Sequence, residues 1–97
     1  MPKAMFMISY SIKPDRRSEY LALAGELKSH LRSTGHKDYS VFETKGKTNA
    51  FTEIYITGSL EELDAIDDQD EKTEALVSKL EQCIDERTKK YSTLVEA

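Results

Sequence analysis

Alternating apolar and polar positions along residues 5–12 predict a β-strand near the start of the chain. One side of this strand carries Phe6, Ile8, Tyr10 and Ile12, and the other carries Met5, Met7, Ser9 and Ser11. Pro14 has no backbone N–H and disfavours helical angles at Lys13, so we expect the strand to end there. Asp15 is then predicted to cap a helix.

A helix-like spacing follows, with apolar residues three or four positions apart. This stripe consists of Tyr20, Leu23, Ala24, Leu27 and Leu31. Gly35 is expected to end the helix, because glycine readily adopts the left-handed conformation of a helix C-terminus. We therefore predict an amphipathic helix packed on a sheet.

Residues 37–44 and 49–57 are rich in β-favouring side chains. Between them, Lys45-Gly46-Lys47-Thr48-Asn49 has the composition of a turn. The two segments are predicted to form an antiparallel hairpin.

Ser59 and Glu62 have the spacing of a capping box, which predicts a second helical region. Leu60, Leu63 and Ile66 suit a short helix, and Asp67-Asp68-Gln69-Asp70 is expected to break it. A long helix is predicted next, in which Leu76, Leu80, Cys83, Ile84 and Arg87 continue the helical pattern, with Cys83 on its apolar side. Residues 91–95 are predicted to form a short last strand.

The predicted order is strand, helix, two strands, helix, strand, which is the order of a ferredoxin-like α+β domain. Right-handed connections would place both main helices on one face of a four-stranded antiparallel sheet. Both sides of the two central strands nevertheless carry apolar residues, whereas a face open to water should alternate cleanly. We therefore expect a second copy of the chain to cover the free face as a homodimer.

The pattern resembles the dimeric α+β barrel superfamily, which includes antibiotic-biosynthesis monooxygenase-like and NIPSNAP-like proteins. The likeness spans nearly the whole chain. It is carried by the first strand ending in Ile12-Lys13-Pro14-Asp15, the helix with Tyr20 and Leu23, and the strand Phe51-Thr52-Glu53-Ile54-Tyr55, which runs into Ser59-Leu60-Glu61-Glu62-Leu63. The resemblance implies two sheets that associate into a barrel, with a pocket between each sheet and its helices.

Monooxygenase-type members often have an aromatic residue, frequently Trp, at the place of Tyr55 and an acidic residue at that of Glu53. They also commonly have a His in the segment matching residues 67–70. This chain has no Trp and has Asp67-Asp68-Gln69-Asp70 in that segment. The absence of Trp, and of His in this segment, argues against a haem-degrading or quinone-forming member.

Composition narrows the functional classes. Ninety-seven residues suit one domain, here residues 1–97, and no run approaches the roughly 18 apolar residues of a membrane span. One cysteine cannot form an internal disulfide, and the first ten residues do not read as a signal peptide, so a cytoplasmic protein is expected. A net charge of -4 argues against nucleic-acid binding.

The charge is unevenly distributed. Residues 13–47 hold eight basic and five acidic side chains, whereas residues 61–74 hold eight acidic side chains and one lysine. The acidic segment would suit a hard cation or a solvated surface, and it lacks the glycine-centred loop of an EF-hand.

Tyrosines from three predicted strands, Tyr10, Tyr39 and Tyr55, can converge with Phe51 and Glu53. Such a cleft would suit an aromatic or quinone-like ligand, and the alternative is that the rings only pack the core or the dimer interface. A buried Glu53 would have to pair or hold a proton, which would make it a usable acid or base, whereas on a wet face it is only solvated.

The two histidines, His30 and His36, either act as a general base or anion ligand or are isolated surface residues. Their spacing is not that of a zinc site, and we expect neither a metal nor a cofactor.

Two functional hypotheses remain. The chain is a small-molecule-binding or assembly module without chemistry of its own, or it is a cofactor-independent monooxygenase-like or isomerase-like enzyme acting on a small aromatic or quinone-like substrate. In the enzyme, Glu53 would be the base, Tyr55 and His36 would orient the substrate, and Tyr10, Tyr39 and Phe51 would contact it.

Overall fold

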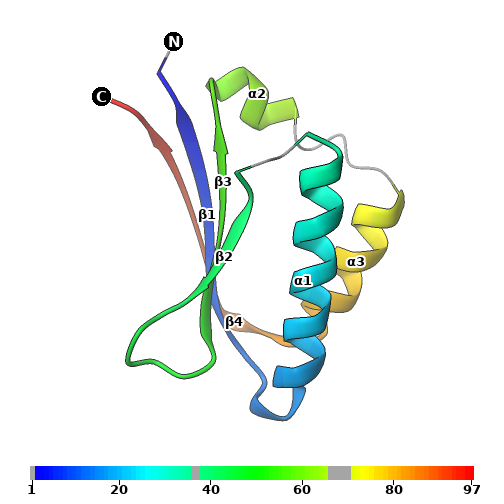
Figure 1. The fold of residues 1–97 in the computed structure, drawn as a ribbon. Coiled ribbons are helices and arrows are strands. Elements are labelled where there is room, and N and C mark those ends of the chain that lie inside the picture. The colour runs from blue at the N-terminus through cyan, green and yellow to red at the C-terminus, as the bar shows by residue number, and fades with distance from the viewer. Residues whose placement is uncertain (1, 36–37, 66–70) are drawn as a thin grey trace.

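The computed structural model describes residues 2–35, 38–65 and 71–97. The elements are β1 (Ala4–Ile12), the 3-10 turn η1 (Pro14–Arg16), α1 (Arg17–Ser33), β2 (Ser40–Glu43), β3 (Ala50–Thr57), α2 (Leu60–Ala65), α3 (Glu71–Glu81) and β4 (Ile84–Val95). The strands form a four-stranded antiparallel sheet in the order β2-β3-β1-β4, and helices α1 and α3 pack on one face of it (Figure 1). The expected ferredoxin-like α+β fold is confirmed.

Helix α1 buries the predicted stripe against the sheet, with Tyr20, Ala24, Leu27 and Leu31 all in the core. It ends as expected, because Gly35 has a φ of 106°, in the left-handed region that favours glycine. The predicted Asp15 cap is wrong. Pro14 starts the 3-10 turn instead, and neither that turn nor α1 has a side-chain cap at its N-terminus.

The predicted hairpin is present, although β2 is shorter than expected and begins at Ser40. Positive φ angles at Gly46 (86°) and Asn49 (68°) turn the chain between β2 and β3. The Arg17 guanidinium donates to both carboxylate oxygens of Glu43, at 2.6 and 2.8 Å, and to Asn49 Oδ1 at 2.8 Å. These bonds attach the base of the turn to α1.

The capping box at α2 is confirmed with one change of partner. The Glu62 N–H donates to Ser59 Oγ at 3.2 Å, while the Glu62 carboxylate accepts the N–H of Gly58, one residue before Ser59, at 2.9 Å. Ile66 and the expected break at residues 67–70 lie outside the described residues.

The predicted continuation of the last helix through Arg87 is wrong. Helix α3 ends at Glu81, and the Cys83 N–H donates to the Leu80 carbonyl in a turn that leads into β4. Cys83 and Ile84 are buried there, so they continue the apolar spacing of the helix without belonging to it. Ile84 pairs with Ile12, and β4 runs beside β1 in the same chain up to Val95.

The face of the sheet opposite the helices carries apolar side chains. Cross-strand pairing places Met5 beside Ile56 and Leu94, and Met7 beside Ile54, all on this side. None of these five residues is buried. We call them the open apolar face.

None of the helices in the described ranges is long and apolar enough to span a membrane.

A substitution at Leu27 tests the packing of α1 on the sheet. Replacing this fully buried side chain with alanine leaves a cavity between α1 and the sheet, so Leu27→Ala should lower the free energy of unfolding by about 2–5 kcal/mol. Urea denaturation measures the change. Leu21→Ala is the matched control, since Leu21 on the same helix is 47% exposed, and an equal loss in both variants would contradict the packing.

Candidate functional site

A buried carboxylate lies on the helix-facing side of β3. Phe51, Glu53 and Tyr55 occupy alternate positions and are all buried, with Glu53 only 5% exposed. A charged residue type is rarely buried to this extent without partners. Its surroundings therefore define the candidate site.

Two tyrosine hydroxyls hold the Glu53 carboxylate. Tyr10 from β1 donates to Oε2 at 2.7 Å, and Tyr39, immediately before β2, donates to Oε1 at 2.7 Å. Tyr20 from α1 lies 2.7 Å from the Tyr10 hydroxyl, oxygen to oxygen. Because the single O–H of Tyr10 is used in its hydrogen bond to Glu53, the Tyr20 hydroxyl is the donor in the contact between the two tyrosines. The result is a buried chain from α1 through β1 to β3.

Aromatic rings enclose this chain. Tyr20 packs on Phe51 with ring centroids 4.6 Å apart, and Tyr39 packs on Tyr55 at 4.8 Å. The structure thus brings together five of the sequence-predicted site residues, which are Tyr10, Tyr39, Phe51, Glu53 and Tyr55. His36 lies outside the described residues.

Burial raises the pKa of the Glu53 carboxyl above its ordinary value. The hydrogen bonds from Tyr39 and Tyr10 and the positive charge of Lys89 on β4 act in the opposite direction, and Glu81 on α3 adds to the increase. Burial also raises the pKa of the four buried tyrosines, with the charge of Glu53 contributing in each case; these are Tyr10, Tyr20, Tyr39 and Tyr55. These four side chains therefore remain protonated.

Glu53 and its tyrosine partners are shielded from solvent. Tyr10, Tyr20 and Tyr39 are each at most 3% exposed, and every buried side-chain nitrogen or oxygen within the described ranges has a hydrogen-bond partner. A ligand that contacts a Glu53 oxygen therefore competes with the tyrosine hydroxyl already bonded to it. The arrangement can hold a proton and can pass one between Glu53, Tyr10 and Tyr20.

Sequence reasoning did not assign Tyr20 and Lys89 to this site. Tyr20 was read only as part of an apolar stripe, although a hydroxyl in a stripe of leucine and alanine signals a buried polar partner. Lys89 lies between the helix predicted through Arg87 and the strand predicted for residues 91–95, and its place in the sheet follows only from the full length of β4.

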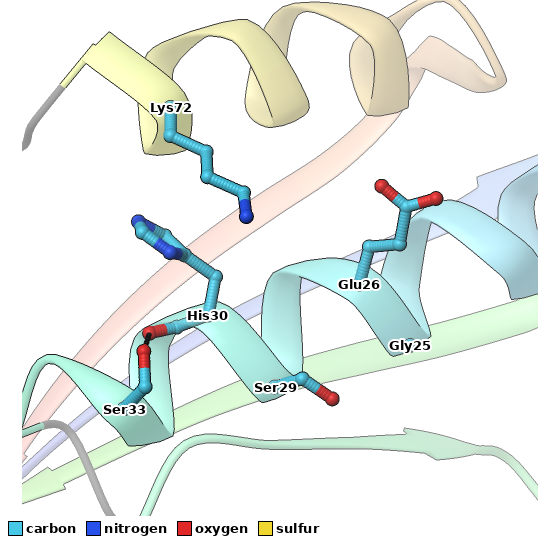
Figure 2. Close-up of a pocket in the computed structure, with 6 residues that line it drawn as sticks. All are labelled: Gly25, Glu26, Ser29, His30, Ser33 and Lys72. Atoms are coloured by element: carbon cyan, nitrogen blue, oxygen red, sulfur yellow. Dashed lines mark hydrogen bonds between the residues drawn. The ribbon is translucent and has the colours of Figure 1, made fainter.

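His30 lies elsewhere, in an open groove of about 530 Å³ between α1 and α3. Figure 2 shows His30 of α1 and Lys72 of α3 facing one another, with Glu26 directed into the same space. The Ser33 hydroxyl donates to the His30 carbonyl at 2.6 Å. Positive and negative groups share this groove. A second groove lies beside the β2–β3 turn, and Glu53 lines neither of the two.

In the part of the chain that the structure describes, no three His, Cys, Asp or Glu side chains are grouped closely enough to hold a metal ion. Cys83 is fully buried, and burial raises its pKa, which disfavours the reactive thiolate.

Solved structures share this fold over nearly the whole chain. A conserved protein from Methanosarcina mazei has a TM-score of 0.82 and 15% identity, covering 100% of this chain and 95% of that one. A NIPSNAP family protein from Agrobacterium tumefaciens has a TM-score of 0.74 and 17% identity, covering 98% and 86%. An antibiotic biosynthesis monooxygenase has a TM-score of 0.74 and 19% identity, covering 97% and 96%.

No protein-family model matches the chain, and no curated protein sequence matches it. The expected resemblance to antibiotic biosynthesis monooxygenases and NIPSNAP proteins is therefore confirmed as a likeness of fold.

The raised pKa of Glu53 predicts how stability depends on pH. Since the folded chain holds this proton more tightly than the unfolded chain, the stabilisation is complete below about pH 4.3, the ordinary pKa of Glu. It is lost as the pH rises through the folded-state pKa. Glu53→Gln removes this dependence because glutamine does not titrate. As the pH rises, the free energy of unfolding of the wild type should therefore fall relative to that of Glu53→Gln.

Urea denaturation from pH 4 to pH 8 measures this difference. Tyr39→Phe removes a hydrogen bond that favours the ionised carboxyl, so it should move the transition to higher pH. Parallel pH profiles for the wild type and Glu53→Gln would contradict a raised pKa.

Proposed function

We propose that the chain is one subunit of a homodimer that serves as a small-molecule-binding or assembly module. The observation that carries this proposal is the open apolar face, with methionine, isoleucine and leucine side chains on the face of the sheet that the helices do not cover. Apolar surface left in water costs roughly 25 cal/mol per Å², so covering it with a second copy is favourable. A two-fold dimer buries this same patch from both subunits.

The proposed dimer places the two sheets face to face, about 10 Å apart. The helices remain on the outside of both subunits, and Glu53 stays between the sheet and the helices of its own subunit. Assembly and the buried carboxyl therefore involve opposite faces of one sheet. The cytoplasm remains the expected location of this dimer.

Lysines placed on the open apolar face test this assembly. Met7→Lys/Ile54→Lys puts two charges at the centre of the proposed interface, which should weaken the dimer at least about a hundredfold without disturbing the helix side. Sedimentation velocity at micromolar concentration measures the change. Leu21→Lys on the outer surface of α1 is the control and should leave the dimer intact. A monomeric wild type, or a double variant that dimerises normally, would refute the proposal.

A second candidate function is supported by the Glu53 cluster. Here the chain is a cofactor-independent monooxygenase-like or isomerase-like enzyme for a small aromatic or quinone-like substrate. Glu53 accepts a substrate proton, Tyr55 and His36 orient the substrate, and Tyr10, Tyr39 and Phe51 contact it. The supporting observation is a buried carboxyl whose two oxygens each accept a tyrosine O–H at 2.7 Å.

For this candidate, measuring both turnover and ligand affinity distinguishes a catalytic role of Glu53 from a role in binding. With a panel of phenols, naphthols and quinols, Glu53→Gln should reduce turnover at least about a hundredfold, because the general base is lost, while ligand affinity changes only a few fold. Oxygen consumption and product absorbance measure turnover, and titration calorimetry measures affinity. If the wild type consumes no member of the panel, or if Glu53→Gln leaves both quantities unchanged, the catalytic hypothesis fails.

A further inference from the structure

Two exposed lysines lie at one end of the hairpin. Lys45 and Lys47 belong to the β2–β3 turn, residues 44–49, and neither forms an ion pair with a described residue. Figure 1 shows this turn extending to the side of the sheet opposite the helices. Because the Arg17 bonds to Glu43 and Asn49 hold its base, the turn is presented in a defined position. We call it the lysine turn.

Two exposed acidic residues lie at the other end of the same strands. Asp38 precedes β2, and Glu61 is in the first turn of α2, directly after β3. We call this pair the acidic end. The eight residues of β3 separate the two groups by about 26 Å, well beyond the screening length of about 8 Å at physiological salt. Within one subunit the opposite charges cannot pair.

Contacts beyond the strands can add to a face-to-face dimer. The four strands, of 4 to 12 residues and about 4.8 Å apart, outline a face of roughly 500 Å². Segments beyond the ends of the strands extend this contact, and the lysine turn extends in the required direction.

Two symmetric arrangements keep the strands of a face-to-face dimer aligned. A two-fold axis along the strands would put both lysine turns at the same end of the dimer, where their like charges repel. A two-fold axis across the strands keeps the β2–β3 edges together and places the lysine turn of each subunit over the acidic end of the other. The distribution of charge favours the second arrangement.

We propose that the lysine turn of each subunit, Lys45 and Lys47, docks on Asp38 and Glu61 of the partner subunit, in a homodimer whose two-fold axis runs across the strands. This inference rests on the proposed homodimer and adds its orientation and its polar contacts. The open apolar face supplies the central contact, and the two charged contacts set the register of one sheet on the other.

A charge-exchange experiment tests the docking. Lys45→Glu/Lys47→Glu makes the turn acidic, and Asp38→Lys/Glu61→Lys makes the opposite end basic. Each variant alone should dimerise about tenfold more weakly at low salt, because every charged contact becomes repulsive. When the two are mixed, both contacts become attractive again, and heterodimers should exceed the statistical half of all dimers. Sedimentation and native mass spectrometry measure affinity and composition.

Lys72→Glu/Lys79→Glu is the matched control, with the same change of net charge on exposed positions of α3. It should dimerise as the wild type does, and its mixture with Asp38→Lys/Glu61→Lys should show no enrichment of heterodimers. Circular dichroism checks that every variant is folded. If both exchange variants dimerise as the wild type does, and heterodimers make up the statistical half of the dimers in their mixture, the docking is overturned and the proposal of a homodimer is not. A monomeric wild type would overturn both.

Discussion

The two long helices cover only one face of the sheet, and this constraint shapes the rest of the molecule. Helices α1 and α3 bury Tyr20, Leu27, Leu76 and Leu80 against the sheet, and nothing in the described part of the chain covers the other face. Polar residues would make that face stable in water, yet Met5, Met7, Ile54, Ile56 and Leu94 are there. The proposal of a second copy follows from that mismatch between residue type and environment.

The covered face has the opposite character, since a carboxyl lies among its aromatic rings. Leaving Glu53 without partners would be costly, and the structure instead gives each oxygen a tyrosine hydroxyl. Such a cluster fixes four segments relative to one another through polar contacts. The same cluster has the chemistry of a proton-holding site. Its close packing fits a module without chemistry of its own, and its raised pKa fits the enzymatic alternative.

Much of the fold was predictable because it depends on local patterns. Alternation placed β1, β-favouring side chains placed β3, spacing placed α1, and the turn residues placed the hairpin. The end of α3 was not predictable, because Cys83 and Ile84 continue the helical spacing while the chain turns into β4. Glu53 and its tyrosines were foreseen as a group. The donor order, and the part of Tyr20 in it, depend on side chains from elements that only the folded chain brings together.

The central claim is that the open apolar faces of two copies pack on each other. Isotope-filtered NMR on a mixture of labelled and unlabelled chains tests it directly, through contacts of the Met5 and Met7 methyl groups with the other molecule. The account predicts intermolecular contacts from these methyls to Ile54, Ile56 or Leu94. Methyl groups that contact only their own chain and water, at concentrations where the protein is fully folded, would contradict it.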